Sequence, residues 1–480
     1  MTHIVLVIPR GEALRNFVYG ATLPRLTAAA RVTLLSVVTD DALLEPARRH
    51  GAAVLPLAHQ PPPRATAYVR GLAENAHDRW LWSAVMRNSW SVRHARAVAR
   101  GPAAYARRRA LDVAARLFGH RPGLAALTRL ERAAQAGDAV RRFAPLLRDL
   151  EPDLVFNGSH IHGPAGGPPL RAAHRLGIRT AGFIFSWDNL TSRSRIFEPY
   201  DDELVWHQAM ADQLRGLYPE IPARRVHAVG TPQFDVHLDP STAWPRARLC
   251  AETGLEPARP YVLYTTGIDR HFPEEHRHVA AVIRHLKALD LPTRPQLLVR
   301  TYVKGTSDAM RALLADHADD PDVVSPPVAW EPRWQTPLPS DQALYSNLVR
   351  HCAAGINAAS TVTLELLLFG KPVINLDFDP PGAALGWDDG FPRHIRFDHF
   401  RPVAASGATW VATSDAHMRR CLREALTQPA MRRGAARALL GAMFRGANGE
   451  DLLDGQAGAR VADVLLRLAR RAQRGRSTAA

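Results

Sequence analysis

Apolar runs alternate with amphipathic stretches along most of this chain of 480 residues. Runs at residues 3–9, 32–39 and 53–57 are separated by segments whose apolar positions recur at helical spacing. Strands that are apolar throughout are typical of parallel sheets buried on both faces. The pattern therefore predicts a β-α-β-α-β run with right-handed crossovers at the start of the chain.

A long helical region, from about residue 71 to residue 150, interrupts this alternation. It follows a proline-rich break at 61–68, and glycines predict further breaks at Gly101-Pro102 and near 119–123. Strands and helices then alternate again up to residue 240. We therefore predict an N-terminal Rossmann-like domain at 1–240 that contains a helical insertion.

A second alternating region follows a proline-rich linker at 241–259. It begins with a strand at residue 261 and ends with an amphipathic helix at 455–474, which is suited to packing over the first domain. We assign 260–480 to a C-terminal Rossmann-like domain. The predicted class is α/β, with two Rossmann-like domains facing across a cleft, and ligands are expected at the carboxyl ends of the strands.

Residues 353–379, AAGINAASTVTLELLLFGKPVINLDFD, predict a strand, a tight turn, a helix and a further strand. The N–H groups of Ser360, Thr361 and Val362 would lie at the helix N-terminus, where a phosphate is the natural ligand. Glu365 lies further along the helix, where a carboxylate suits two vicinal hydroxyls such as those of a ribose. These features predict a nucleotide site. The alternative is an ordinary α/β unit with a solvated glutamate.

The residues ASTVTLELLLFGKPVI resemble the nucleotide-binding unit of GT-B glycosyltransferases. They are similar to the lipid-linked N-acetylglucosaminyltransferase of peptidoglycan synthesis and to CDP-glycerol glycerophosphotransferases. The resemblance implies that Glu365 binds the ribose. Retaining members often have a second glutamate eight residues earlier, where this chain has Asn357, so an inverting reaction is implied. Non-hydrolysing sugar-nucleotide epimerases share the fold and part of the pattern.

Further donor-binding residues are expected at other strand ends of the C-terminal domain. Thr266 and Gly267 follow its first strand, where GT-B enzymes place a loop near the diphosphate. Arg300 and Lys304 are predicted to neutralise the leaving phosphates. Asp379 is expected to bind donor-sugar hydroxyls, with the capping of a turn as the alternative.

The candidates for the catalytic base lie in the N-terminal domain. His160 and His162 follow one predicted strand and Asp188 follows the next, so the three should meet at one sheet edge. An inverting transferase needs a base that takes the proton of the acceptor hydroxyl. The surrounding SWDNLTS resembles bacterial polysaccharide-type transferases, which implies that Trp187 and Asn189 lie at the acceptor.

Positive charge is concentrated in the helical insertion. The formal net charge is +15, and residues 87–148 contain fourteen arginines, no lysine and three acidic residues. Arginine-rich amphipathic helices that also carry tryptophan and leucine suit an anionic membrane surface. A solvated insertion with a high arginine content is the alternative. Nucleic acid is not an expected partner, because no zinc-finger or RNP-type motif accompanies the charge.

The compartment is predicted from cysteines and apolar runs. The three cysteines are scattered and have no metal-binding spacing, so we expect a reducing cytoplasm and no disulfide framework. No Cys/His/Asp cluster has metal-binding spacing, and the GT-B resemblance implies an enzyme that needs no bound metal and no cofactor. No apolar run reaches the roughly 18 residues that span a bilayer, and the N-terminus lacks a signal-peptide pattern. We expect a cytoplasmic protein, and the basic insertion would allow peripheral binding to the inner face of a bacterial membrane.

These features together predict a metal-independent glycosyltransferase. The expected donor is a UDP- or CDP-linked sugar, and the expected acceptor is a lipid-linked or saccharide hydroxyl in surface polysaccharide or glycolipid synthesis. Three alternatives stay open. They are transfer of glycerophosphate or another alditol phosphate, sugar-nucleotide epimerisation, and a non-catalytic binding protein of the same fold. Thr301-Tyr302 stands where CDP-glycerol transferases are expected to have a His-Pro pair, which counts against the first alternative.

Overall fold

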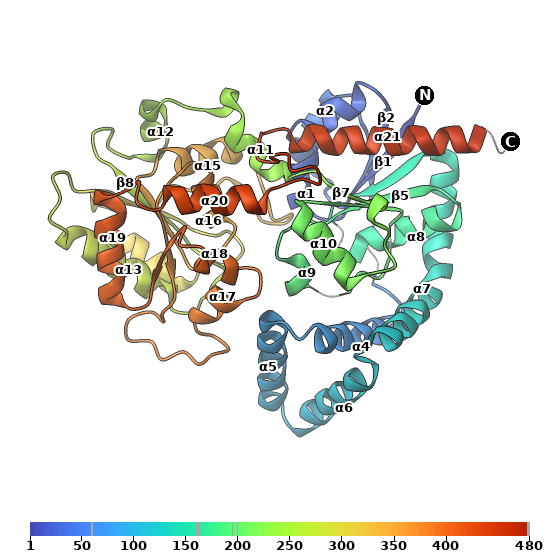
Figure 1. Ribbon diagram of the computed structural model, residues 1–480, viewed down its shortest axis with the longest axis horizontal. Helices are drawn as coiled ribbons and strands as arrows, with labels where there is room; N and C mark the ends of the chain where they lie inside the picture. The colour runs from blue at the N-terminus through green and yellow to red at the C-terminus, as the bar shows by residue number, and fades with distance from the viewer. Residues whose placement is uncertain (59–60, 160–163, 194, 199, 478–480) are drawn as a thin grey trace. The chain divides into compact units, whose positions relative to one another are not determined.

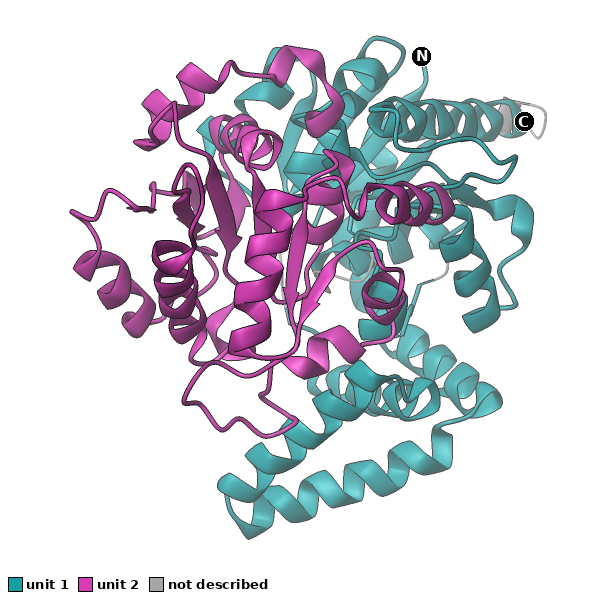
Figure 2. Ribbon diagram, turned by 60° about the vertical axis from the view of Figure 1, so that its left-hand side comes forward, with its two compact units in different colours: residues 1–235, 444–480 teal, residues 236–443 magenta. Residues whose placement is uncertain are grey.

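The computed structural model describes residues 1–58, 61–159, 164–193, 195–198 and 200–477. The chain separates into two compact units, shown in Figure 2. Unit 1 comprises Met1–Asp235 and Phe444–Ala480, and unit 2 comprises Val236–Met443. Each unit contains a parallel sheet flanked by helices. The predicted α/β class with two Rossmann-like domains is therefore confirmed.

Unit 1 is built on a seven-stranded sheet in the order β3-β2-β1-β4-β5-β6-β7. The central strand β1 (His3–Ile8) is buried along its whole length and pairs in parallel with β2 (Arg31–Ser36) and β4 (Leu154–Asn157). Each of the other strand pairs is also parallel, as apolar strands buried on both faces predict. The remaining strands are β3 (Ala53–Pro56), β5 (Arg179–Phe183), β6 (Asp202–Val205) and β7 (Val226–Ala228).

The helical insertion of unit 1 starts earlier than predicted. Its helix α4 (Arg64–Leu81) begins directly after the prolines at 61–63, since proline suits the entry to a helix and not its interior. The insertion continues through α5 (Ala84–Ala99), α6 (Pro102–Phe118) and α7 (Arg121–Leu150), as Figure 1 shows. Gly101 separates α5 from α6 with a φ of 101°, a conformation that side chains with a Cβ rarely adopt.

Shorter helices complete unit 1. They are α1 (Glu12–Phe17), α2 (Thr22–Thr27), α3 (Asp41–Arg49), α8 (Gly167–Arg175), α9 (Asn189–Ser192) and α10 (Gln208–Leu217), and α11 (Pro232–Leu238) leads into unit 2. Within the described ranges, none of the helices has the length and apolar character that a membrane crossing requires.

The C-terminal helix belongs to unit 1, which differs from the predicted domain at 260–480. Helix α21 (Ala457–Ser477) lies against α2, β4 and β5. Its residues Val461, Leu465 and Ala469 are fully buried there. The carboxylate of Asp235 accepts hydrogen bonds from the backbone N–H groups of Ala457 (3.1 Å) and Gly458 (2.7 Å) at the start of the helix. The apolar stripe of α21 thus finds its partner in unit 1.

Unit 2 is built on a six-stranded sheet in the order β10-β9-β8-β13-β14-β15, again parallel throughout. These strands are β8 (Tyr261–Thr265), β9 (Gln296–Arg300), β10 (Val323–Val324), β13 (Ala354–Asn357), β14 (Val373–Leu376) and β15 (Trp410–Ala412). A separate antiparallel pair is formed by β11 (Trp330–Glu331) and β12 (Thr336–Pro337). The predicted linker at 241–259 contains the helix α12 (Arg246–Thr253) and lies within unit 2.

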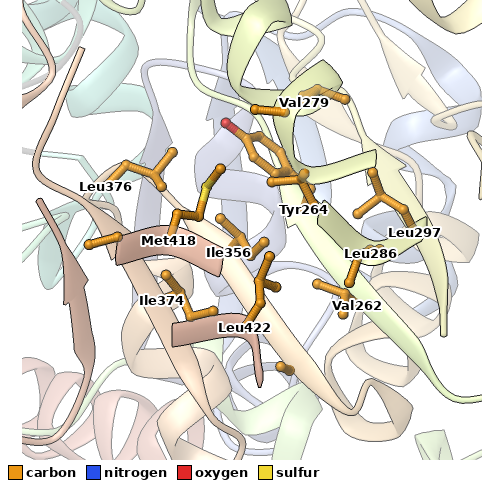
Figure 3. Packing of buried hydrophobic residues seen from close by; sticks show 14 of the residues in the cluster. Val262, Tyr264, Val279, Leu286, Leu297, Ile356, Ile374, Leu376, Met418 and Leu422 are labelled. Carbon is orange, nitrogen blue, oxygen red and sulfur yellow. The ribbon is translucent and has the colours of Figure 1, made fainter. Parts of the chain in front are cut away.

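Helices α13 (Glu275–Ala288) and α19 (Asp415–Thr427) supply side chains to the core of unit 2 (Figure 3). Strand residues such as Val262 and Ile356 pack there with Leu286 of α13 and Leu422 of α19. The other helices of the unit are α14 (Asp308–Asp316), α15 (Pro339–His351), α16 (Val362–Leu368), α17 (Pro392–Arg396), α18 (Arg401–Ala405) and α20 (Arg433–Met443).

Candidate functional site

The sheet of unit 2 changes direction between its neighbouring strands β8 and β13. From β8 the chain order runs outward to β9 and β10, and from β13 it runs the other way to β14 and β15. Ligands of open α/β sheets bind in the crevice outside the carboxyl ends of the strands at such a switch point. The predicted donor residues Thr266 and Gly267 follow β8, and Ser360 and Thr361 follow β13, so they lie at this edge.

Asn357 fixes the turn that follows β13. Its side chain is buried, and its Oδ1 accepts hydrogen bonds from the N–H of Ser360 (3.1 Å), the Oγ1 of Thr363 (3.0 Å) and the Nδ2 of Asn375 (3.2 Å). The N–H of Ser360 therefore has a partner within the turn, which differs from the prediction that it points at a phosphate. Thr361 is the N-cap residue of α16, and its neighbour Val362 is half-buried.

Glu365 lies on α16 and is only 5% exposed, so it is not the solvated carboxylate of the alternative interpretation. The hydroxyl of Tyr345 on α15 donates a hydrogen bond to its Oε2. The Nε2 of His237, another buried residue, lies 3.8 Å from its Oε1. The opposite ring nitrogen of His237 is 3.0 Å from the Oγ of Ser346, which fixes the plane of the imidazole. Glu365 is thus a buried carboxylate held between a phenol and an imidazole.

Arg300, the last residue of β9, lies next to this group. Its guanidinium carbon is 5.1 Å from the ring centroid of Tyr345. Its Nη2 donates to the carboxylate of Asp341 over 2.7 Å, and both side chains are buried. Asp341 also accepts a hydrogen bond from the indole of Trp330 (3.2 Å). Asp341 therefore compensates the charge of Arg300 within the structure, and the phosphate-neutralising role of Arg300 stays a prediction.

Lys304 lies in the loop after β9. Its ammonium is 6.0 Å from the ring centroid of Tyr302, within reach of a cation–π contact, and the residue is half-buried. The N–H of Tyr302 donates to the Oγ1 of Thr266 over 2.9 Å. This bond joins the loops after β8 and β9, so the predicted residues Thr266 and Lys304 belong to one group of loops.

A buried carboxylate fixes the loop after β8. The N–H of Gly267 donates to Glu275 over 2.9 Å, and the hydroxyl of Tyr264 donates to the same carboxylate over 3.2 Å. A Cβ atom at Gly267 would lie 1.9 Å from the ring of Phe272, so the position accepts only glycine. Burial, as the largest effect, raises the pKa of Glu275 to about 8.

The predicted acceptor residues of unit 1 form a compact turn between β5 and α9. The carboxylate of Asp188 accepts hydrogen bonds from the hydroxyls of Ser186 and Ser192, and the Oδ1 of Asn189 accepts one from the N–H of Ser186 (3.0 Å). Trp187 and Asn189 are buried, and Asp188 is half-buried. In the described structure, Asp188 therefore holds this turn together.

The other two candidates for the base, His160 and His162, lie outside the described residues. Asp379 is described, and its Oδ1 accepts a hydrogen bond from the N–H of Phe391 over 3.0 Å, at the start of α17. This contact fits the turn-capping alternative for Asp379. In the described part of the chain, histidine, cysteine, aspartate and glutamate form no group of three or more that would suit a metal ion.

Sequence reasoning did not identify several residues of this edge. Tyr345, His237 and Glu275 come from α15, α11 and α13, and none of them is part of the motif at 353–379. Tyr345 occupies an ordinary position on an amphipathic helix, so no sequence signal marked it. His237 lies on α11, far along the chain from that motif, so no sequence signal marked it either.

Comparison with known proteins supports the fold. No protein-family model and no curated protein matches the sequence. Three similar solved structures each cover nearly the whole chain. A UDP-GlcNAc 2-epimerase from Neisseria meningitidis bound to UDP-GlcNAc is 12% identical, with 97% of this chain and 100% of that chain covered and a TM-score of 0.55. A Staphylococcus aureus MnaA–UDP structure is 11% identical, with 96% of this chain and 95% of that chain covered and a TM-score of 0.52. A glycosyltransferase from Rickettsia africae is 10% identical, with 97% of this chain and 98% of that chain covered and a TM-score of 0.50. At these identities the likeness shows a shared GT-B-type fold.

The raised pKa of Glu275 predicts a pH-dependent stability. The folded state keeps this proton up to about pH 8, whereas an unfolded glutamate, with its ordinary pKa of 4.5, has already released it. The free energy of unfolding should therefore fall as the pH rises from about 4.5 to about 8. Glu275→Gln keeps an oxygen for the N–H of Gly267 but does not titrate, so we expect its stability to fall less over this range.

Thermal unfolding between about pH 5 and pH 8 measures this difference. Glu252→Gln, on the exposed face of α12, is the matched control and should follow the wild-type pH dependence. Identical slopes for Glu275→Gln and the wild type would show that Glu275 does not hold a proton in the folded protein.

Proposed function

We propose that this chain is a glycosyltransferase that binds a nucleotide-sugar donor at the carboxyl edge of the unit 2 sheet. The observation that carries the proposal is the buried carboxylate of Glu365 beside the switch point between β8 and β13. A buried carboxylate is stable only where hydrogen-bond donors surround it. Tyr345 and His237 belong to that environment, and the vicinal hydroxyls of a ribose are donors of the kind that such a carboxylate accepts.

The loops at the same edge suit the other parts of a nucleotide sugar. Thr266 and Gly267 on one side and Thr361 and Val362 on the other lie at the ends of adjacent strands, where a diphosphate would be held. Lys304 adds positive charge in the loop after β9. Two of the similar solved structures are complexes with UDP or UDP-GlcNAc, which supports a UDP-linked donor, and a CDP-linked donor fits the same chemistry.

The acceptor is proposed to bind in unit 1. A lipid-linked or saccharide hydroxyl would lie near Trp187 and Asn189, and His160, His162 or Asp188 would take its proton as the sugar is transferred with inversion. This proposal requires no metal ion and no cofactor. Synthesis of a bacterial surface polysaccharide or glycolipid is the proposed process.

The helical insertion supports an acceptor at an anionic membrane surface on the cytoplasmic side. Seven large apolar residues are exposed among its described residues. They are Tyr68, Val98, Tyr105, Val113, Leu117, Phe118 and Leu130. Exposed apolar side chains among arginines suit the boundary between lipid headgroups and acyl chains.

Sugar-nucleotide epimerisation is the second candidate function. The observation that favours it is the similarity, over nearly the whole chain, to a UDP-GlcNAc 2-epimerase solved with its sugar nucleotide. An epimerase, unlike a transferase, needs no acceptor.

Incubation with UDP- and CDP-sugars, with and without lipid-linked and saccharide acceptors, separates the two functions. When an acceptor is present, we expect free nucleotide and a glycosylated acceptor as the products. Chromatography detects these products, and NMR of the anomeric proton shows the configuration of the new bond. Conversion of the donor sugar to its epimer without any acceptor would replace the transferase proposal by the epimerase. Binding of the donor without either reaction would leave a binding protein.

Glu365 should contribute directly to nucleotide affinity. Glu365→Gln keeps an acceptor for the Tyr345 hydroxyl but removes the negative charge. Loss of hydrogen bonds to a charged acceptor costs about 1.5–3 kcal/mol, so we expect UDP or CDP to bind about 10- to 150-fold more weakly. Calorimetry measures this change, with Glu252→Gln as a control of equal charge. Equal affinity of Glu365→Gln and the wild type would remove Glu365 from the nucleotide site.

Substitution of the proposed base should lower turnover and leave donor binding nearly unchanged. We expect one of His160→Ala, His162→Ala and Asp188→Asn to lower kcat by about 10²–10⁴ while the Kd of the donor changes little. Since Asp188 also holds its turn, Ser192→Ala, which removes one hydrogen bond to the same carboxylate, is the control for a purely structural effect. Wild-type turnover in all three base variants would place the base elsewhere.

A further inference from the structure

A pocket of about 420 Å³ in unit 1 lies apart from the residues discussed so far. It forms where α7 begins, beside Trp80 of α4 and the end of α10. Among the described residues, four arginines and one carboxylate, that of Glu220, line it. The arginines are Arg121, Arg129, Arg132 and Arg195.

Three of these arginines are oriented by uncharged oxygen atoms. Arg121 donates to the carbonyl of Gly216 (3.1 Å), Arg132 to the carbonyl of Phe197 (2.6 Å), and Arg195 to the hydroxyl of Thr128 (2.6 Å). In the part of the chain that the structure describes, no carboxylate oxygen lies within 4.0 Å of any of the four guanidinium groups. Their positive charge is therefore positioned but not neutralised by an ion pair.

The acidic residues next to the pocket already form ion pairs with other arginines. Glu131 is fully buried and pairs with Arg70 (2.9 Å) and with Arg171. Glu198 pairs with the same Arg171. Burial is the main cause that lowers the pKa of Arg132; the charge of Glu198 opposes this shift, and the charges of Arg171 and Arg195 add to it. An anion in the pocket would relieve this repulsion.

The uncharged part of the lining is apolar. Trp80, Leu124, Leu217 and Pro219 form it, together with Pro122 at the start of α7. The N-terminus of this 30-residue helix adds partial positive charge at the same place. The volume lies within the range of small-molecule sites, which is about 300–1,000 Å³. Charge and apolar wall together suit a ligand with an anionic head and an apolar portion.

We propose that this pocket binds the phosphate or diphosphate group of an amphiphilic ester, with the apolar portion lying against Trp80 and Leu217. Guanidinium groups recognise phosphate oxygens through paired, charge-assisted hydrogen bonds, and four of them converge here. The ligand is either a lipid with a phosphate headgroup or a soluble phosphate ester. The proposal does not depend on the nucleotide site of unit 2.

Calorimetry on the full chain with decyl phosphate and with inorganic pyrophosphate tests the pocket. Arg129 is exposed and holds no other group of the described structure in place, so Arg129→Gln should fold normally. We expect it to weaken binding of both probes about tenfold, the effect of one charge-assisted hydrogen bond. Arg129→Gln combined with Arg132→Gln should weaken binding further.

Arg109→Gln is the matched control, because Arg109 is an exposed arginine of α6 that does not line the pocket. It removes the same charge and should change the affinity less than twofold. Equal weakening by Arg109→Gln and Arg129→Gln would overturn the proposal in favour of unspecific charge attraction. No binding of either probe to the wild type would overturn it as well.

Vesicles distinguish the two sources of the phosphate. Cosedimentation with phosphatidic acid vesicles that is reduced in Arg129→Gln and not in Arg109→Gln would identify a lipid headgroup. Binding of decyl phosphate without vesicle binding would identify a soluble ester. Phosphatidylserine vesicles control for surface charge, and equal recovery of both variants with them is expected.

Discussion

A parallel sheet that is buried on both faces lets a polar side chain reach a ligand almost only where a strand ends. Unit 2 shows this constraint strand by strand. Ile356 is fully buried, and the next residue, Asn357, ties together the turn that leads into α16. Val299 is fully buried, and the next residue, Arg300, pairs with Asp341. The polar residues of the candidate site lie together because the sheet leaves them no other position.

The same constraint explains what the sequence could predict. Continuous apolar runs located the strands of both sheets, and the serine, threonine and glycine residues after β8 and β13 located the candidate site. The partners of Glu365 could not be predicted, because nothing in the sequence links it to Tyr345, 20 residues earlier on α15, or to His237 on the distant helix α11. The position of Glu365 on a short helix also did not show whether its carboxylate is buried or solvated.

The charge of the helical insertion also differs between what the sequence predicts and what the structure contains. The sequence places fourteen arginines at residues 87–148, yet several of them are neutralised within the insertion. Arg93 pairs with Asp78 (2.8 Å), and Arg108 pairs with Asp112. Arg129 is left without such a partner among the described residues. A count of arginines along the sequence therefore overstates the electrostatic field of the insertion. It also does not reveal where the charge without an ion-pair partner is concentrated.

The position of α21 makes unit 1 discontinuous along the chain, whereas unit 2 is continuous from Val236 to Met443. During synthesis, unit 2 emerges complete before the last helix of unit 1 has been made. Until then, the surfaces of α2, β4 and β5 that α21 covers are exposed to solvent, and the backbone groups that Asp235 will bind do not yet exist. Unit 1 therefore completes its folding last, although it contains the first residues of the chain.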